Sequence, residues 1–374
     1  ADNLHRAVAG DSADAAGPRL DAPAAQQQPA ASAPPRPLPW ADPEPPEGVT
    51  EPQSAFYVER SADAEALRAI REQGVTVTIK GARQVGKTSL LSRVAAEARR
   101  HGKRALVLDF QLFERRLLGD TDRLFRYFCE AVTIGLGVES RVDAFWGNMG
   151  NSYHCTRYLE RYLLPQLDAP LVLAIDKVDR LPHAATRSDF FGMLRTWCQN
   201  RATTPVWKRL DLVLVTSTEP HRLVDNPYQS PFNIGLTVAL DDFTPAQVVD
   251  LNQRHGLPFA PAQLEALTAL LGGHPYLIRR ALYLATAGRL APEELIARAH
   301  DDGGPFGDHL RYQLFKLGGQ PKLIVELRRI LSRGAHTDEQ AFYELHSAGL
   351  VRREGERSAP RCQLYGAYLR ERLA

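Results

Sequence analysis

Short runs of aliphatic and β-branched residues alternate with helical patterns over the first two thirds of the chain. In residues 75–80, valine and isoleucine alternate with threonine and lysine, which is typical of a strand. Three later runs are almost continuously apolar and predict strands buried on both faces, at residues 104–110, 170–176 and 211–218. Helices are expected between them at residues 62–73, 89–100, 120–165 (interrupted near Gly147 and Gly150) and 187–200. Strands that alternate with helices predict an α/β fold with a parallel sheet covered on both faces.

Beyond Leu240 the pattern becomes helical, with short amphipathic segments that often begin at a cap and a proline. Helices are predicted at residues 244–255, 261–271, 276–287 and 291–299. Further helices are predicted at residues 309–317, 321–332 and 338–348, then strands at 349–354 and 360–364, and a closing helix. Helices followed by a β-hairpin indicate a winged helix. We therefore expect four parts: a tail (1–52), a core (53–240), a helical part (241–305) and a winged-helix domain (306–374).

Composition adds little to this division except at the N-terminus. The chain has 374 residues, 44% of them hydrophobic and 24% charged, which are ordinary globular values. Residues 1–52 hold 11 of the 26 prolines and show no helical or strand period, so they are predicted to be a disordered tail.

The net charge of +2 demands neither nucleic acid nor an acidic partner. The four cysteines form no C-x-x-C pair, so no zinc site or disulfide framework is indicated. No apolar run approaches the length of a membrane span, so we expect a soluble, cytoplasmic protein.

A glycine-containing loop follows the first predicted strand directly. Residues 81–88 match the pattern G-x-x-x-x-G-K-[ST] without a gap, and a helix follows. Gly81 and Gly86 let backbone N–H groups turn toward a phosphate chain, and the helix N-terminus adds its partial positive charge. Lys87 can reach the β- and γ-phosphates, and the Thr88 hydroxyl is a natural Mg²⁺ ligand. The strand and helix that flank the loop argue against a chance match.

The loop predicts binding of ATP or ADP together with Mg²⁺. The residues assigned to the nucleotide are Gly81, Ala82, Arg83, Gln84, Val85, Gly86, Lys87, Thr88 and Ser89.

An acid at the end of a buried strand forms the second half of an ATP site. Asp176 takes this place and is assigned to Mg²⁺ together with the loop threonine. The next position usually carries a glutamate that orients the attacking water, but in this chain it is Lys177. A protonated lysine cannot accept a proton; it could pair with Asp176 or Asp179 or the γ-phosphate, or point to solvent. In each of these cases ATP hydrolysis should be slow. Asp109 or Asp179 would have to act as the base in place of the usual glutamate.

Hydroxyl residues end the strand at 211–218. One of Thr216, Ser217 and Thr218 can sense the γ-phosphate or its water, and Thr218 is the residue assigned to that role. The alternative is that these hydroxyls only complete the hydrogen bonds of the strand end.

Six segments in this order resemble the AAA-like domain family of STAND-class ATPases, which is related to the origin-recognition ATPases. The segments are FYVER (56–60), GARQVGKTSLL (81–91), LVLAIDKVD (171–179), TSTEP (216–220), QSPFN (229–233) and GGHPYL (272–277). The resemblance covers residues 53–374 and implies an AAA-type core, a helical lid (241–305) and a winged-helix domain (306–374). It also implies that the segment around Tyr57, Val58, Glu59 and Arg60 lies beside the adenine and that Pro275 covers the base or ribose.

The chain departs from the family pattern at Lys177, because the family usually has D-E-x-D where this chain has D-K-V-D. The departure concerns catalysis and leaves binding intact. The resemblance further implies effector or sensor partners in bacterial defence and signalling, and an oligomer in the ATP state.

Two functions of different classes follow from these patterns. The first is a switch in which ATP or ADP sets the arrangement of core, lid and winged helix for an effector or sensor. The second is a DNA-binding ATPase that uses the winged helix, supported only by a mild excess of basic residues after Leu310. A solvated basic face explains that excess as well. A scaffold with a purely structural nucleotide is a third interpretation.

Overall fold

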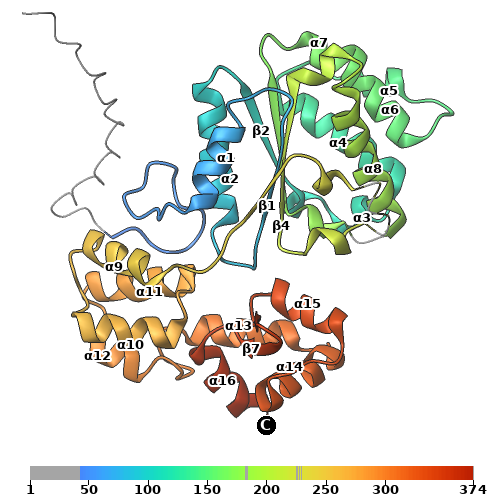
Figure 1. The fold of residues 1–374 in the computed structure, drawn as a ribbon. Coiled ribbons are helices and arrows are strands. Elements are labelled where there is room, and N and C mark those ends of the chain that lie inside the picture. The colour runs from blue at the N-terminus through green and yellow to red at the C-terminus, as the bar shows by residue number, and fades with distance from the viewer. Residues whose placement is uncertain (1–42, 182–183, 225, 227, 229, 374) are drawn as a thin grey trace, which may run out of the picture. The chain divides into compact units, whose positions relative to one another are not determined.

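Five parallel strands form the central sheet of the protein (Figure 1). The computed structural model describes residues 43–181, 184–224, 226, 228 and 230–373; residues 1–42 of the predicted tail and Gln229 of the QSPFN segment lie outside the described residues. The strand order is β2-β3-β4-β1-β5. The strands are β1 (Thr76–Lys80), β2 (Arg104–Asp109), β3 (Leu171–Asp176), β4 (Leu210–Thr216) and β5 (Leu236–Ala239).

Helices cover both faces of the sheet, as the alternation of strands and helices predicted (Figure 1). One face carries α1 (Ser61–Ala69) and α2 (Lys87–Arg100); the other carries α4 (Thr121–Gly135), α6 (Asn151–Tyr158) and α8 (Ala184–Asn200). The shorter elements are η1 (Phe110–Leu112), α3 (Arg115–Leu118), α5 (Val142–Phe145), η2 (Leu159–Leu163), α7 (Leu164–Gln166), η3 (Val178–Arg180), η4 (Pro205–Arg209), η5 (Pro220–Arg222) and η7 (Pro231–Asn233). Within β3, Leu173 packs on the second face and Val172 on the first. Burial on both faces explains why the predicted strands are continuously apolar.

Strand β5 was not predicted from the sequence. It has four residues, and Val238 is the only one of them that is buried, so it shows no clear period. It joins the sheet by pairing with β1, where Val77 aligns with Leu236. The preceding Gly235 has φ +84°, and a Cβ there would lie 2.1 Å from the carbonyl oxygen of Thr76. The chain can enter this edge position only with a glycine at that point.

The rest of the chain forms a middle helical segment (245–297) and a C-terminal segment (307–373). The middle helical segment contains α9 (Pro245–Arg254), α10 (Pro261–Leu271), α11 (Pro275–Thr286) and α12 (Pro292–Ala297). The C-terminal segment contains α13 (Gly307–Leu317), α14 (Pro321–Arg333), α15 (Glu339–Ser347), β6 (Val351–Glu354), β7 (Arg357–Pro360) and α16 (Gln363–Leu373). The two segments share one hydrophobic core.

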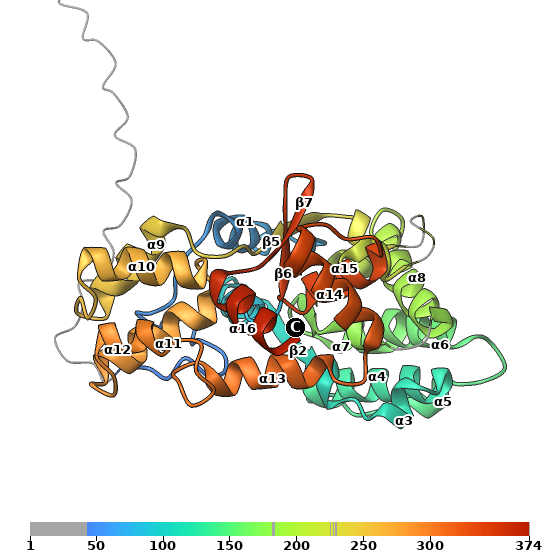
Figure 2. The same cartoon turned by 90° about the horizontal axis from the view of Figure 1, so that it is seen from below.

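The β6–β7 hairpin projects beyond the neighbouring helices (Figure 2). The expected second strand at residues 360–364 was wrong in its position, because Glu354 pairs with Arg357 across a two-residue turn. Gly355, with φ +61°, supplies the left-handed conformation that such a turn requires. The strand therefore ends at Pro360, and the closing helix begins at Gln363.

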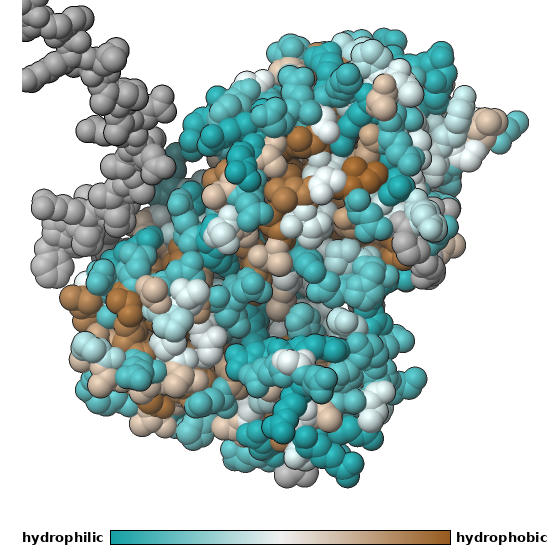
Figure 3. Space-filling model, viewed as in Figure 1, coloured by the Kyte–Doolittle hydropathy of each residue, from teal (hydrophilic) through white to brown (hydrophobic). Residues whose placement is uncertain are grey.

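The visible face of the molecule is largely hydrophilic, with separate apolar areas (Figure 3). Among the described residues, none of the helices combines the length and the apolar character that crossing a membrane requires.

A buried ion pair fixes the start of β4 against β1 and α1. Lys103 and Asp211 have 3% and 0% exposed side chains, and Nζ lies 2.7 Å from Oδ2. The ammonium also donates to the Ile70 carbonyl (2.7 Å), and the carboxylate accepts from the Val75 N–H (2.8 Å). Burial raises the pKa of Asp211, and the hydrogen bond from Lys103 opposes that rise. Each charge is therefore stable only in the presence of the other.

We expect Lys103→Met to lower the free energy of unfolding by about 3–5 kcal/mol, because Asp211 would remain buried without its cation. Urea denaturation measures the loss. The matched control is Arg123→Met, which removes an exposed pair with Asp120 at 3.4 Å and should cost less than about 1 kcal/mol. Similar small losses in both variants would show that the buried pair contributes no more than a surface pair.

Candidate functional site

The glycine-containing loop lies between the end of β1 and the start of α2. Gly86 is the N-cap of α2 and has φ +98°. A Cβ on Gly81 would lie 2.7 Å from the carbonyl oxygen of Leu240, so this position is closed to other residues. The loop therefore passes close to the chain that follows β5. Its backbone takes a left-handed turn immediately before the helix N-terminus, as a phosphate-binding loop requires.

Lys87, the first residue of α2, folds back on its own loop. Its ammonium donates to the carbonyl oxygens of Gly81 (2.9 Å) and Ala82 (2.8 Å). Burial lowers the pKa of Lys87 to about 8, although Asp179 and Asp176 act in the opposite direction. Two carbonyl oxygens of the loop thus accept hydrogen bonds from the Lys87 ammonium. A bound phosphate would take the place of these carbonyl oxygens.

Thr88 and Asp176 meet across the gap between α2 and β3. The threonine hydroxyl donates to the carboxylate at 2.8 Å, and Asp176 is 2% exposed. Burial raises the pKa of Asp176, and the hydrogen bond from Thr88 opposes it. No cluster of three or more His, Cys, Asp or Glu suited to a metal occurs in the described part of the chain. One hydroxyl beside one carboxylate nevertheless fits Mg²⁺, which keeps several waters and takes further oxygens from phosphates.

Lys177 pairs with Asp109, a partner that the sequence analysis did not consider. Its ammonium lies 2.7 Å from Asp109 Oδ2 and 2.5 Å from Gln111 Oε1. The partners expected from the sequence were Asp176 or Asp179, and neither forms an ion pair with Lys177 in the described structure. The β2–β3 register explains the difference, because Asp109 aligns with Asp176 across the sheet. Lys177 also has φ +57°, a left-handed conformation at the start of η3.

Asp179 is held by the end of β4. Its Oδ2 accepts from the Ser217 N–H and from the Thr218 hydroxyl, both at 3.2 Å. The Thr216 hydroxyl in turn donates to the Thr218 carbonyl oxygen at 2.9 Å. Both carboxylates considered as substitute bases, Asp109 and Asp179, therefore already have partners. Of the three predicted hydroxyl residues, Ser217 lines the cavity at the loop, whereas Thr218 faces Asp179.

A cavity of about 620 Å³ lies over the loop and the ends of β3 and β4. Its lining contains five cationic side chains and two carboxylates: Arg83, Lys87, Lys177, Arg180 and Lys316, with Asp176 and Asp179. We call it the phosphate cavity. The excess of positive charge suits a polyphosphate. Lys316 and Tyr312 come from α13, and no local pattern in the sequence singled them out.

A second cavity of about 320 Å³, which we call the base cavity, continues from the first. Both cavities are lined by Gly48, Gln84, Gly86 and Ser89. Four of the residues predicted to lie at the adenine or ribose line this cavity: Tyr57, Val58, Arg60 and Pro275. Arg60 donates to the Val85 carbonyl oxygen at 2.8 Å.

Pro46, Glu47, Gly48, Thr50 and Arg279 also line the base cavity, and sequence reasoning missed them. The Thr50 N–H donates to Ser89 Oγ at 3.0 Å, and Arg279 donates to Thr50 Oγ1 at 2.5 Å. Arg280 pairs with Glu47 at 2.9 Å. Residues 43–52 therefore belong to the folded protein, and the boundary predicted at residue 52 was too late. Contacts with distant helices hold them, and these contacts leave no local signal.

The C-terminal segment holds the backbone of the loop at Arg83. The Arg83 N–H donates to the Ser347 carbonyl oxygen at 3.3 Å, and Arg361 donates to the Arg83 carbonyl oxygen at 3.1 Å. Arg361 also forms a bidentate ion pair with Asp242, and its side chain is 4% exposed. A Cβ on Gly349 would lie 2.8 Å from Arg361 Nη1, so glycine leaves the room that this guanidinium needs. We call these contacts the Arg83 clamp.

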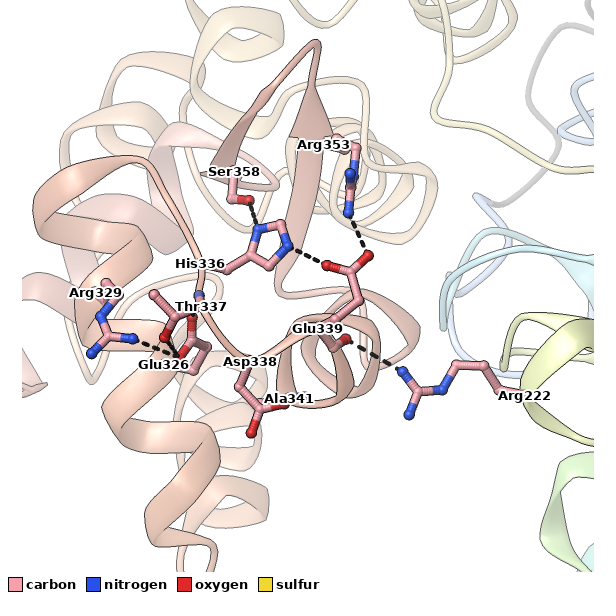
Figure 4. Close-up of polar contacts among 10 residues, drawn as sticks. All are labelled: Arg222, Glu326, Arg329, His336, Thr337, Asp338, Glu339, Ala341, Arg353 and Ser358. Atoms are coloured by element: carbon pink, nitrogen blue, oxygen red, sulfur yellow. Dashed lines mark hydrogen bonds and ion pairs between the residues drawn. The ribbon is translucent and has the colours of Figure 1, made fainter. Parts of the chain in front are cut away.

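A second connection joins the chain after β4 to the C-terminal segment (Figure 4). Arg222 donates to the Glu339 carbonyl oxygen at 3.3 Å. The Glu339 carboxylate contacts His336 (2.5 Å) and Arg353 on β6 (2.9 Å). His336 contacts Ser358 on β7 at 2.6 Å. Polar contacts thus connect η5, which follows β4, with both strands of the hairpin.

A profile of the AAA-like domain family matches residues 45–371. An uncharacterized WD repeat-containing protein of Synechocystis is 27% identical over 235 residues, which cover 60% of this chain and 19% of that protein. The chain thus spans about a fifth of that curated relative.

Solved structures show a similar fold. A Walker-type ATPase of Pyrococcus abyssi is 16% identical, with a TM-score of 0.56 over 86% of this chain and 98% of the other. The ORC1 protein of Aeropyrum pernix in complex with DNA is 15% identical, with a TM-score of 0.45 over 85% and 94% of the two chains. At these identities the likeness concerns the fold alone.

We expect Lys87→Ala to abolish measurable ATP binding, because each lost charge-assisted hydrogen bond to phosphate is worth about 1.5–3 kcal/mol. Isothermal titration calorimetry with MgATP tests this expectation. The matched control is Lys80→Met, at the other end of the loop, where Nζ pairs with Glu219 at 3.0 Å; it should bind as the unchanged protein does. Equal ATP affinity in Lys87→Ala and the unchanged protein would disprove the assignment of the loop.

Proposed function

The chain belongs to the AAA-like domain family, and from that membership we propose that it is an ATP- and ADP-binding switch of the STAND kind. In this proposal the bound nucleotide sets the arrangement of the core, the middle helical segment as a lid, and the C-terminal segment as a winged helix. An effector or sensor module reads that arrangement, in bacterial defence or signalling, and the ATP state favours oligomers.

The two connected cavities support the nucleotide assignment. The phosphate cavity carries an excess of positive charge next to a helix N-terminus, and the base cavity adds buried aromatic and aliphatic side chains. Thr88 and Asp176 would hold Mg²⁺, which bridges phosphate oxygens and neutralises their charge. Tyr57, Val58 and Pro275 would contact the base and ribose.

The Arg83 clamp is the single observation that carries the switch proposal. Nucleotide binding fixes the backbone of the glycine-containing loop, because its N–H groups must turn toward phosphate. In this protein the N–H and the carbonyl oxygen of one loop residue, Arg83, are both bonded to the C-terminal segment. A change in the loop therefore acts directly on that segment.

Hydrolysis is expected to be slow, and the Lys177–Asp109 pair strengthens that expectation. The position that usually supplies a base carries a cation, and the nearest carboxylate is neutralised by it at 2.7 Å. Binding and hydrolysis are thus separable in this site.

The DNA-binding alternative receives little support from the hairpin. Arg352 pairs with Glu354 at 2.5 Å and Arg353 pairs with Glu339 at 2.9 Å. Two of the three arginines of the hairpin are thus paired within the protein, whereas non-specific DNA binding depends on cations that are free to contact phosphates. We therefore place the switch first.

Hydrogen exchange of the purified protein tests the switch. We expect MgADP and a non-hydrolysable MgATP analogue to give different exchange rates in residues 343–349 and 357–361, with α4 as the internal control. Arg361→Lys should still bind nucleotide but lose this response, because lysine cannot chelate Asp242 and bind the Arg83 carbonyl together. Nucleotide binding with unchanged exchange in the C-terminal segment would refute the switch and favour a structural nucleotide.

Lys177→Glu alone would be a poor test of the missing base, because the new carboxylate would lie beside Asp109. We expect the double variant Lys177→Glu/Asp109→Asn to raise single-turnover ATP cleavage by about a hundredfold or more, the contribution typical of a general base. Asp109→Asn alone is the matched control and should stay slow. If the unchanged protein already cleaves ATP as fast as the double variant, the base lies elsewhere, and Asp179 is the next residue to replace.

A further inference from the structure

We propose that Lys316 on α13 is a ligand for the terminal phosphate of a bound nucleoside triphosphate, supplied to the site by the C-terminal segment. The inference rests on the proposed nucleotide site and assigns to it a residue that distinguishes the triphosphate from the diphosphate.

The position of Lys316 in the phosphate cavity is the first observation. It lines this cavity together with Asp176, Lys177 and Arg180 at the end of β3, and it does not line the base cavity. The two cavities meet at Gly86 and Ser89, and Lys87 and Thr88 line the phosphate cavity alone. A nucleotide with its base near Tyr57 would therefore extend its phosphates into the cavity that Lys316 lines.

The second observation is that Lys316 has no anionic partner in the described part of the protein. None of the ion pairs there, at distances up to 4.0 Å, includes it. Asp179 lines the same cavity, but its Oδ2 is occupied by Ser217 and Thr218. The ammonium lies instead 3.9 Å from the centre of the Tyr312 ring, one turn earlier on α13. A half-buried ammonium at a cavity wall, held by a ring rather than a carboxylate, is available to an incoming anion.

The third observation is a like-charge neighbour. Arg83 of the loop lines the phosphate cavity and also the adjoining cavity beneath α13, and Lys316 lines both as well. Burial lowers the pKa of Lys316 to about 8, and the positive charge of Arg83 contributes to the decrease. Two cations from different parts of the chain thus repel each other until an anion lies between them.

Because α13 packs against other helices of the C-terminal segment, a contact between Lys316 and a phosphate would affect more than nucleotide affinity. His309 on the same helix bonds to the Tyr365 hydroxyl at 2.7 Å, and Leu310 and Leu317 are buried in the shared core. A contact between Lys316 and a phosphate would therefore also restrain the rest of the C-terminal segment, which packs against α13. The diphosphate would leave Lys316 without an anion, whereas the triphosphate would join α13 to the loop.

The test compares Lys316→Met with Lys316→Arg, and uses Lys322→Met as the matched control, since Lys322 is an exposed lysine at the start of the next helix. Dissociation constants for MgADP and a non-hydrolysable MgATP analogue are measured by calorimetry for each full-length protein. We expect Lys316→Met to weaken triphosphate binding by about 10- to 100-fold, as the loss of one charge-assisted contact does, while diphosphate binding stays the same. Lys316→Arg should recover much of the triphosphate preference, and Lys322→Met should change neither constant.

Two further readouts separate a ligand from a structural residue. Without nucleotide, Lys316→Met should leave the melting temperature unchanged or slightly higher, because it removes the repulsion with Arg83. The triphosphate should slow hydrogen exchange in α13 of the unchanged protein but not of Lys316→Met. Equal losses for both nucleotides, or an unchanged ratio of the two affinities, would overturn the role of Lys316 while leaving the switch intact. Failure of the unchanged protein to bind either nucleotide would instead refute the proposed function.

Discussion

One buried guanidinium connects the glycine-containing loop, the chain after β5 and the C-terminal segment. Arg361, in the C-terminal segment, chelates Asp242 at the exit from the sheet and also donates to the Arg83 carbonyl oxygen of the loop. Its side chain is 4% exposed, so its charge is stable only while both acceptors remain in place. Removal of either acceptor would leave a buried cation partly unpaired. The loop, the chain after β5 and the C-terminal segment therefore keep or change their arrangement together.

The parallel sheet explains why the chemistry gathers in one place. Because parallel strands point the same way, the carboxyl ends of β1, β2, β3 and β4 share one edge of the sheet, and the loop, Asp109, Asp176 and Ser217 follow from that geometry. The cavity at this edge contains more cations than carboxylates. Lys87 donates to carbonyl oxygens of its own loop, and Lys316 and Arg83 both line this cavity. The charges that line this cavity therefore favour the binding of an anion.

Under the proposed function, the Lys177–Asp109 pair would separate nucleotide binding from hydrolysis. The lysine removes the usual base and also neutralises the nearest carboxylate, so two candidate bases are lost through one ion pair. Phosphate binding does not require either group, because the loop backbone, Lys87 and Thr88 are unaffected. In the proposed switch, the protein would respond to which nucleotide is bound, and a slow chemical step would lengthen the lifetime of each state.

The sequence alone predicted strands β1 to β4, the glycine-containing loop, and the assignment of Thr88 and Asp176 to one site. A strand buried on both faces leaves a continuous apolar run in the sequence, and the loop residues stand next to one another in a recognisable motif. Parallel strands then place their carboxyl ends, and the polar residues there, at one edge of the sheet. Tertiary structure alone decided that Lys177 pairs with Asp109, 68 residues away, that Lys316 lines the phosphate cavity, and that Arg361 holds the loop. A single lysine or arginine on a helix has no periodic signature, and its partner depends on which distant segments pack together.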